Sequence, residues 1–190
     1  MLLTLPFLGN RNYLQSSTLW EALLEVTEIE YPCTLKIRKP LFSNHVKISS
    51  YEPDPHATLT WENHTVTVSE LPASGEPWRE PFPEKVIWNK IEKADDMYFY
   101  RSAQNDFALP RLAISLFKYC LIHTAHLPGN VQWMFIQSEM LSKQPFIIHQ
   151  IALSEIQNSA VAAKATITVN GEKWSHLYFT RAPISQGTAS

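Results

Sequence analysis

Hydrophobic and polar positions along this 190-residue chain predict the same order of elements twice. Each half starts with an apolar segment, passes through a polar loop into a long amphipathic helix, and ends in strand-like runs. The apolar segment is 2–7 in the first half and 97–100 in the second, and the strand-like runs extend to Leu71 and Thr180. Few residue identities link the halves, so the repeat is one of pattern and bears on the fold more than on the function.

The first helix is predicted to begin near Thr18. Thr18 and Glu21 have the S/T-x-x-E spacing of a capping box. Tyr31-Pro32 should end the helix, because the residue before a proline avoids helical backbone angles. Between them, apolar residues recur on one face at helical spacing: Leu19, Trp20, Leu23, Leu24 and Ile29.

The second helix is predicted to begin near Pro110, since proline is tolerated in a first helical turn. The segment 126–130, with its proline and glycine, should stop it. Its apolar stripe is Leu112, Ala113, Leu116, Phe117 and Cys120.

Two hairpins are predicted from turn residues. Asn170-Gly171 is typical of a two-residue type I′ turn between alternating strands. Strict two-residue pairing would set Ala165 beside His176 and place His176 on the core-facing side.

An earlier hairpin is predicted to turn at Asn63-His64 and to pair Trp61 with Val66. Two further runs, 131–137 and 146–155, are apolar on both faces over part of their length. We expect both to be central strands.

This organisation predicts two halves, 1–71 and 87–182, joined by a crossover at 72–86 and followed by a tail at 183–190. The crossover holds four prolines and therefore cannot be a central strand. The tail is small and polar and is expected to fray.

Composition narrows the class of protein. The formal charge is −2, from 16 Lys and Arg against 18 Asp and Glu, without a basic block, so nucleic acid is not an expected partner.

The apolar run at the N-terminus, about seven residues, is short for a signal peptide or a membrane span. Cys33 and Cys120 are interpreted as buried hydrophobes of a cytoplasmic protein. No zinc-ligand spacing or phosphate-binding glycine loop occurs, so no metal or cofactor is expected.

One helix wrapped by a twisted antiparallel sheet, occurring twice from residue 2 to about 181, resembles a tandem arrangement of the hotdog-fold superfamily. The expected fold class is α+β and tandem hotdog-like, with two long helices each wrapped by an antiparallel β-sheet. Hotdog proteins are mainly thioesterases and hydroxyacyl dehydratases that act on coenzyme A or acyl-carrier-protein substrates. The resemblance therefore implies an acyl-CoA or acyl carrier protein partner, and it leaves a homodimer open.

The family's dehydratase signature, H-F-P-G-x-P, precedes the central helix. His126-Leu127-Pro128-Gly129 shares its His, Pro and Gly but follows the predicted second helix. We interpret this segment as a helix stop, and His126 is the last of three catalytic candidates.

A thioester site needs donors that polarise the carbonyl and a group that moves a proton. At the entrance of the first helix, Arg11 could hold a phosphate or carboxylate, and Tyr13 and Gln15 could orient a carbonyl. Alternatively, Ser17 and Thr18 cap this helix while Tyr13 packs beneath it.

At the entrance of the second helix, Asn105 is a candidate substrate ligand and Asp106 is the first choice for a general base or nucleophile. The alternative for Asp106 is an acid favoured by the helix dipole. His176 is the second catalytic candidate, because a histidine that lines a cavity suits acid–base chemistry. Its alternative is a hydrogen-bonded core residue.

Two functions remain open from the sequence. The first is an acyl-thioester enzyme of thioesterase or hydroxyacyl dehydratase type, and the second is a non-catalytic ligand-binding or assembly subunit of the same fold. A polyketide cyclase-like or nuclear-transport-factor-like pocket protein is a third interpretation, which strand order would separate.

Overall fold

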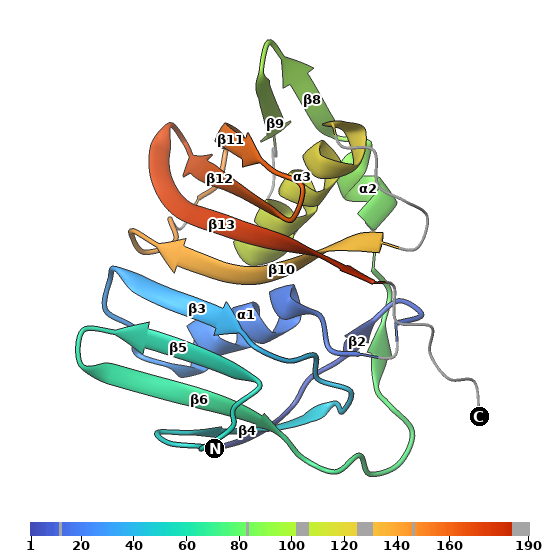
Figure 1. Ribbon diagram of the computed structural model, residues 1–190, viewed down its shortest axis with the longest axis vertical. Helices are drawn as coiled ribbons and strands as arrows, with labels where there is room; N and C mark the ends of the chain where they lie inside the picture. The colour runs from blue at the N-terminus through green and yellow to red at the C-terminus, as the bar shows by residue number, and fades with distance from the viewer. Residues whose placement is uncertain (12, 83, 102–106, 125–130, 146, 184–190) are drawn as a thin grey trace. The chain divides into compact units, whose positions relative to one another are not determined.

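The computed structural model describes residues 1–11, 13–82, 84–101, 107–124, 131–145 and 147–183. The chain divides into two compact units, each an antiparallel sheet accompanied by a helix (Figure 1). The first unit is Met1–Pro83 with Gln137–Lys143, and the second is Glu84–Ile136 with Gln144–Ser190.

The first unit has the strand order β1-β4-β6-β5-β3, and β3 pairs on its other side with residues 137–140 of strand β10. All of these pairings are antiparallel, while the short strands β2 and β7 pair in parallel. The elements of this unit are β1 (Leu2–Thr4), β2 (Phe7–Leu8), α1 (Ser16–Val26), β3 (Cys33–Ile37), β4 (His45–Ser49), β5 (Ala57–Trp61), β6 (His64–Glu70) and β7 (Arg79–Glu80).

The second unit has the strand order β10-β13-β12-β11-β9-β8. Its strand β11 lies between β12 and β9, which confirms the central strand predicted in this part of the chain. The elements are α2 (Glu84–Trp88), β8 (Ile91–Ala94), β9 (Met97–Arg101), α3 (Leu109–Thr124), β10 (Val131–Met140), β11 (Gln150–Asn158), β12 (Ala162–Val169) and β13 (Glu172–Pro183).

The two units differ in the order of their last strands. In the second unit β11, β12 and β13 lie side by side in chain order. In the first unit β4 pairs with β6 instead of β5, so the order across the sheet is β4-β6-β5. The connection from β4 to β5 therefore passes over the position of β6. The repeat seen in the hydrophobic pattern therefore does not extend to strand order.

Helix α3 has the predicted buried stripe. Leu112, Leu116, Phe117 and Cys120 are at most 2% exposed. The Phe117 ring meets the ring of Phe179 on β13 edge to face, with the centroids 4.9 Å apart. This contact identifies the face of the sheet in the second unit that packs against α3.

Helix α1 is shorter than predicted. It ends at Val26, and Thr27 already has extended backbone angles, so the expected continuation to Tyr31-Pro32 is wrong. Adjacent β-branched residues at 26 and 27 have lower helix propensity, which favours a stop there. Trp20 is fully buried and donates its Nε1–H to Met140 Sδ on β10 at 3.1 Å, which fixes α1 within the first unit.

The Asn170-Gly171 turn is confirmed, with φ of 53° and 90° at its two residues, as a type I′ turn requires. The predicted pairing beyond it is wrong. A β-bulge between Ile167 and Thr168 adds one residue to β13, so His176 lies opposite Thr166 instead of Ala165. Because a one-residue shift reverses the faces of a strand, His176 lies on the side away from α3.

The earlier hairpin turns one residue before the predicted position. Trp61 pairs with His64, and the turn residues are Glu62 and Asn63, with Glu62 in the left-handed region at φ 46°. Trp61 and His64 stack with ring centroids 5.5 Å apart. This cross-strand pair accounts for the shift, because His64 contributes more as a strand residue than as a turn residue.

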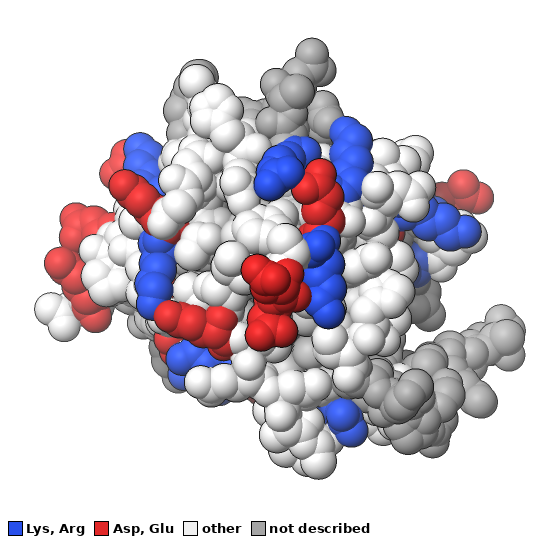
Figure 2. All heavy atoms as spheres, turned by 90° about the horizontal axis from the view of Figure 1, so that it is seen from above, with Lys and Arg blue, Asp and Glu red and all other residues white. Residues whose placement is uncertain are grey.

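Lysine and arginine alternate with aspartate and glutamate over the face shown in Figure 2, without a stripe of one sign in that view. This surface fits the near-neutral charge of the chain. No helix within the described residues is long and apolar enough to span a membrane.

Candidate functional site

The entrance of α1 is an uncapped helix N-terminus. Gln15 is the N-cap residue, with φ −72° and ψ 142°, and its side chain makes no capping hydrogen bond. The first hydrogen bond along the helix runs from Leu19 N–H to the Gln15 carbonyl at 3.2 Å. The first turn contains no acidic residue. The positive end of the helix dipole therefore has no carboxylate of that turn to balance it.

Two buried polar side chains lie at this entrance. Gln15 is 7% exposed and Thr18 is 5% exposed. Neither Gln15 Nε2 nor Thr18 Oγ1 has a hydrogen-bond partner in the described structure. Side chains on a helix lean toward its N-terminus, so the Thr18 hydroxyl is directed at the first turn. Together these groups offer hydrogen-bond donors to an oxygen atom placed at the helix end.

This geometry corrects the predicted cap. Thr18 is the third residue of the helix and not the cap, so the capping box with Glu21 is absent. The alternative, in which Ser17 and Thr18 cap the helix, is also wrong, because Gln15 occupies that position. Tyr13 is partly exposed two residues before the cap.

The segment that leads into α1 is anchored on both sides. The Arg11 guanidinium carbon lies 5.4 Å from the centroid of the Phe82 ring, and the Arg11 carbonyl accepts a hydrogen bond from Arg79 Nη1 at 2.6 Å. Leu14 N–H donates to the carbonyl of Leu41 at 2.7 Å. These contacts anchor the chain at Arg11 and at Leu14, on either side of Tyr13.

At the second predicted entrance, Asn105 and Asp106 lie outside the described residues, as does His126. Their roles stay predictions. The helix that follows begins at Leu109, with Pro110 in its first turn as predicted, and Leu112 N–H donates to the Ala108 carbonyl at 3.1 Å.

His176 does not face the core as the predicted register required, and its proposed catalytic role stays a prediction. It is half-buried on the sheet face opposite α3, and its Nδ1 lies 2.9 Å from Thr166 Oγ1. The Thr166 hydroxyl donates to Glu155 Oε2 at 2.5 Å, and Lys173 Nζ donates to Glu155 Oε1 at 2.6 Å. Glu155 stands in a β-bulge of β11 with φ 52°. His176 is thus the end of a surface hydrogen-bond chain.

This chain gives a pH-dependent prediction. The hydrogen bonds from Lys173 and Thr166 lower the pKa of Glu155. A lowered folded-state pKa contributes stability above the unfolded pKa, and that contribution is lost as the pH falls through the folded pKa. We expect Glu155→Gln to destabilise the protein at pH 7 and to have less effect at acid pH, because the carboxylate loses its charge as the pH falls through its folded-state pKa. Urea unfolding at both pH values measures this, with Glu172→Gln as the control.

A Glu155→Gln effect of equal size at the two pH values would show that the ionised carboxylate contributes no stability.

The cysteines are buried and free. Cys33 is 3% exposed and Cys120 is fully buried, as predicted for small hydrophobes. Burial raises the pKa of Cys33 to about 12, so its thiol is not a nucleophile near neutral pH. Among the described residues, no group of His, Cys, Asp and Glu is arranged to hold a metal ion.

Comparison with known proteins gives fold-level similarity only. No family model matches the chain, and no curated protein matches it. Similar solved structures include the dehydratase domain of PpsC from Mycobacterium tuberculosis in complex with C12:1-CoA, at 10% identity and a TM-score of 0.48, covering 90% of this chain and 85% of that one. Erythromycin dehydratase has 14% identity and a TM-score of 0.48, covering 90% and 82%. The tesB protein of Mycobacterium avium subs. paratuberculosis has 12% identity and a TM-score of 0.45, covering 94% and 91%.

With TM-scores below 0.5, these similarities carry no argument about the site. The fold itself is α+β, with an antiparallel sheet and a helix in each unit. The sequence names Gln15 as a group that could orient a carbonyl, but it indicates Thr18 only as a helix cap, because burial of its hydroxyl without a partner depends on tertiary packing. The only signal in the sequence was the run of polar residues before the first apolar stripe, at 15–18.

Proposed function

We propose that this protein binds an acyl thioester and holds its carbonyl oxygen at the entrance of α1. The observation that supports this is the pair of buried, unpaired polar groups, Gln15 Nε2 and Thr18 Oγ1, at an uncapped helix N-terminus. A carbonyl oxygen accepts hydrogen bonds and gains from the positive end of the helix dipole. The thioester class follows from the hotdog resemblance, and acyl-CoA or an acyl carrier protein is the proposed carrier.

The contacts at α1 support binding of a thioester more directly than its chemical conversion. The donors at α1 can polarise a carbonyl, but thioester hydrolysis or dehydration also needs a proton acceptor. The first turn of α1 contains no acid, and His176 belongs to the surface chain with Thr166 and Glu155. Asp106, three residues before the start of α3, is the proposed base if turnover occurs. We also propose that the two units are two hotdog-like halves in tandem.

The test is a calorimetric titration with acyl-CoA thioesters of increasing chain length, with coenzyme A alone as the reference. We expect acyl-CoA to bind more tightly than coenzyme A, and Gln15→Met to weaken acyl-CoA binding by about tenfold through loss of one buried hydrogen bond. The matched control is Gln157→Met, at an exposed glutamine on β11.

Equal affinity for acyl-CoA and coenzyme A, or an unchanged affinity in Gln15→Met, would contradict the proposal. Release of free thiol during the same titration would identify turnover, and Asp106→Asn should then abolish that release without abolishing binding.

A further inference from the structure

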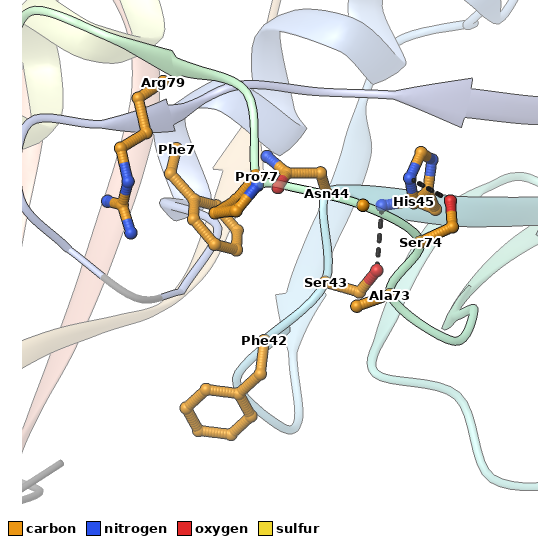
Figure 3. A pocket seen from close by; sticks show the side chains of 10 residues that line it. Phe7, Phe42, Ser43, Asn44, His45, Ala73, Ser74, Pro77 and Arg79 are labelled. Atoms are coloured by element: carbon orange, nitrogen blue, oxygen red, sulfur yellow. Dashed lines mark hydrogen bonds between the residues drawn. The ribbon is translucent and has the colours of Figure 1, made fainter. Parts of the chain in front are cut away.

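A separate pocket of about 230 Å³ lies in the first unit, between the chain segments 42–45 and 73–79 (Figure 3). It lies outside the helix entrance at 15–18. Its walls combine apolar side chains with hydroxyls and one arginine. The residues that line it are Phe7, Phe42, Ser43, Asn44, His45, Ala73, Ser74, Gly75, Pro77 and Arg79.

Buried hydrogen bonds form the wall on the side of Phe7. Asn44 is 5% exposed, and its Nδ2 donates to the carbonyls of Leu5 at 2.6 Å and Trp78 at 3.0 Å. Phe7 N–H donates to the same Trp78 carbonyl at 3.0 Å. The crossover segment is therefore fixed against the N-terminal strands, and the pocket is formed without a ligand.

The His45 ring fixes the opposite wall. Its Nδ1 lies 3.0 Å from Thr4 Oγ1 and its Nε2 lies 3.0 Å from Ser74 Oγ, so both ring nitrogens contact hydroxyls. His45 N–H donates to Ser43 Oγ at 3.0 Å. Because Ser43 accepts this bond, its own hydroxyl hydrogen can be donated to a ligand.

Arg79 supplies the charge of the pocket. Its Nη1 donates to the carbonyls of Gly9 at 3.2 Å and Arg11 at 2.6 Å, and its guanidinium carbon lies 5.5 Å from the centroid of the Phe7 ring. A guanidinium group has five N–H donors, so these bonds leave donors for a ligand. None of the ten lining residues is acidic. Glu70, near the rim, accepts the Phe42 N–H at 2.7 Å.

We propose that this pocket binds a small carboxylate with an apolar body. The carboxylate would pair with Arg79, while the apolar body contacts Phe7, Phe42 and Pro77. Figure 3 shows Pro77 next to Phe7, with Arg79 on the other side of Phe7. An inorganic anion would leave the aromatic walls uncovered. A neutral aromatic molecule would supply no negative charge to pair with the guanidinium group of Arg79.

The test compares benzoate with benzamide, which has the same shape without the charge, and with inorganic phosphate. Amide chemical shifts in a ¹H–¹⁵N spectrum locate binding. We expect benzoate to shift residues 42–45 and 73–79, and benzamide and phosphate to bind at least about tenfold more weakly.

Arg79→Gln should weaken benzoate binding by about tenfold or more, while Arg101→Gln, which removes an exposed arginine paired with Glu92, should not. Since Arg79 also anchors backbone carbonyls, Phe42→Ala gives a second test. Phe42 is 52% exposed, so its loss should spare the fold and still lower benzoate affinity. Equal binding of benzamide, preference for phosphate, or shifts elsewhere would each overturn the proposal.

Discussion

Replacing Thr18 by valine is expected to make the protein more stable and to weaken its binding of an acyl thioester. Thr18 is 5% exposed, and its hydroxyl has no partner in the described structure. Valine has nearly the same shape and a similar helix propensity, and it removes the desolvation cost of the unpaired hydroxyl. We expect a gain of about 1 kcal/mol in the free energy of unfolding and a loss of about tenfold in ligand affinity.

Thr166→Val is the matched control for this substitution. Thr166 is as buried as Thr18, at 1% exposed, but it donates to Glu155 and contacts His176. Its replacement should lower stability, because it removes the hydrogen bond to Glu155 and the contact with His176. Urea unfolding of both variants measures the difference. A destabilised Thr18→Val protein with unchanged ligand affinity would mean that the hydroxyl serves the fold.

Replacing Phe117 by alanine is expected to cost about 3–5 kcal/mol of unfolding free energy. Phe117 is fully buried on α3 and packs edge to face on Phe179, whose ring also meets that of Phe135 at 5.7 Å. The loss removes a large apolar side chain and leaves a cavity between the helix and the sheet. That cost is a large fraction of the stability of an ordinary domain.

The control on the same helix is Ile122→Ala, because Ile122 is 45% exposed. It should change the unfolding free energy by less than about 0.5 kcal/mol. Chemical denaturation of both variants gives the comparison. Similar effects at the two positions would contradict the assignment of Phe117 to the buried face of α3.

The parts of the fold that sequence predicts are those set by local chemistry. The stripe of α3 follows from the helical spacing of its apolar residues, and the turn at Asn170-Gly171 follows from the backbone angles that these residues adopt easily. The bulge in β13 was missed, because β13 can alternate in either phase: Trp174, His176 and Tyr178 fit one face, while Ser175, Leu177 and Phe179 fit the other. Only packing against α3 decides between them.

The same distinction holds for the candidate site. Ser16, Ser17 and Thr18 are three residues that could each begin a helix. Glu21, three residues after Thr18, favours Thr18 as the cap because this is the capping-box spacing. The helix begins at Ser16 instead, which places the Thr18 hydroxyl inside the first turn. Burial of Gln15 and Thr18 without partners depends on residues distant in the sequence, so local patterns could not predict it.

The most direct test of the proposed function is the infrared carbonyl stretch of a bound acyl-CoA labelled with ¹³C at the thioester carbon. Donors at the entrance of α1 should polarise that carbonyl and shift its stretch to lower frequency than in water. The shift should disappear in the double variant Gln15→Met/Thr18→Val. A bound thioester with an unshifted carbonyl, or a shift that survives both substitutions, would contradict the proposal that this helix end holds the carbonyl.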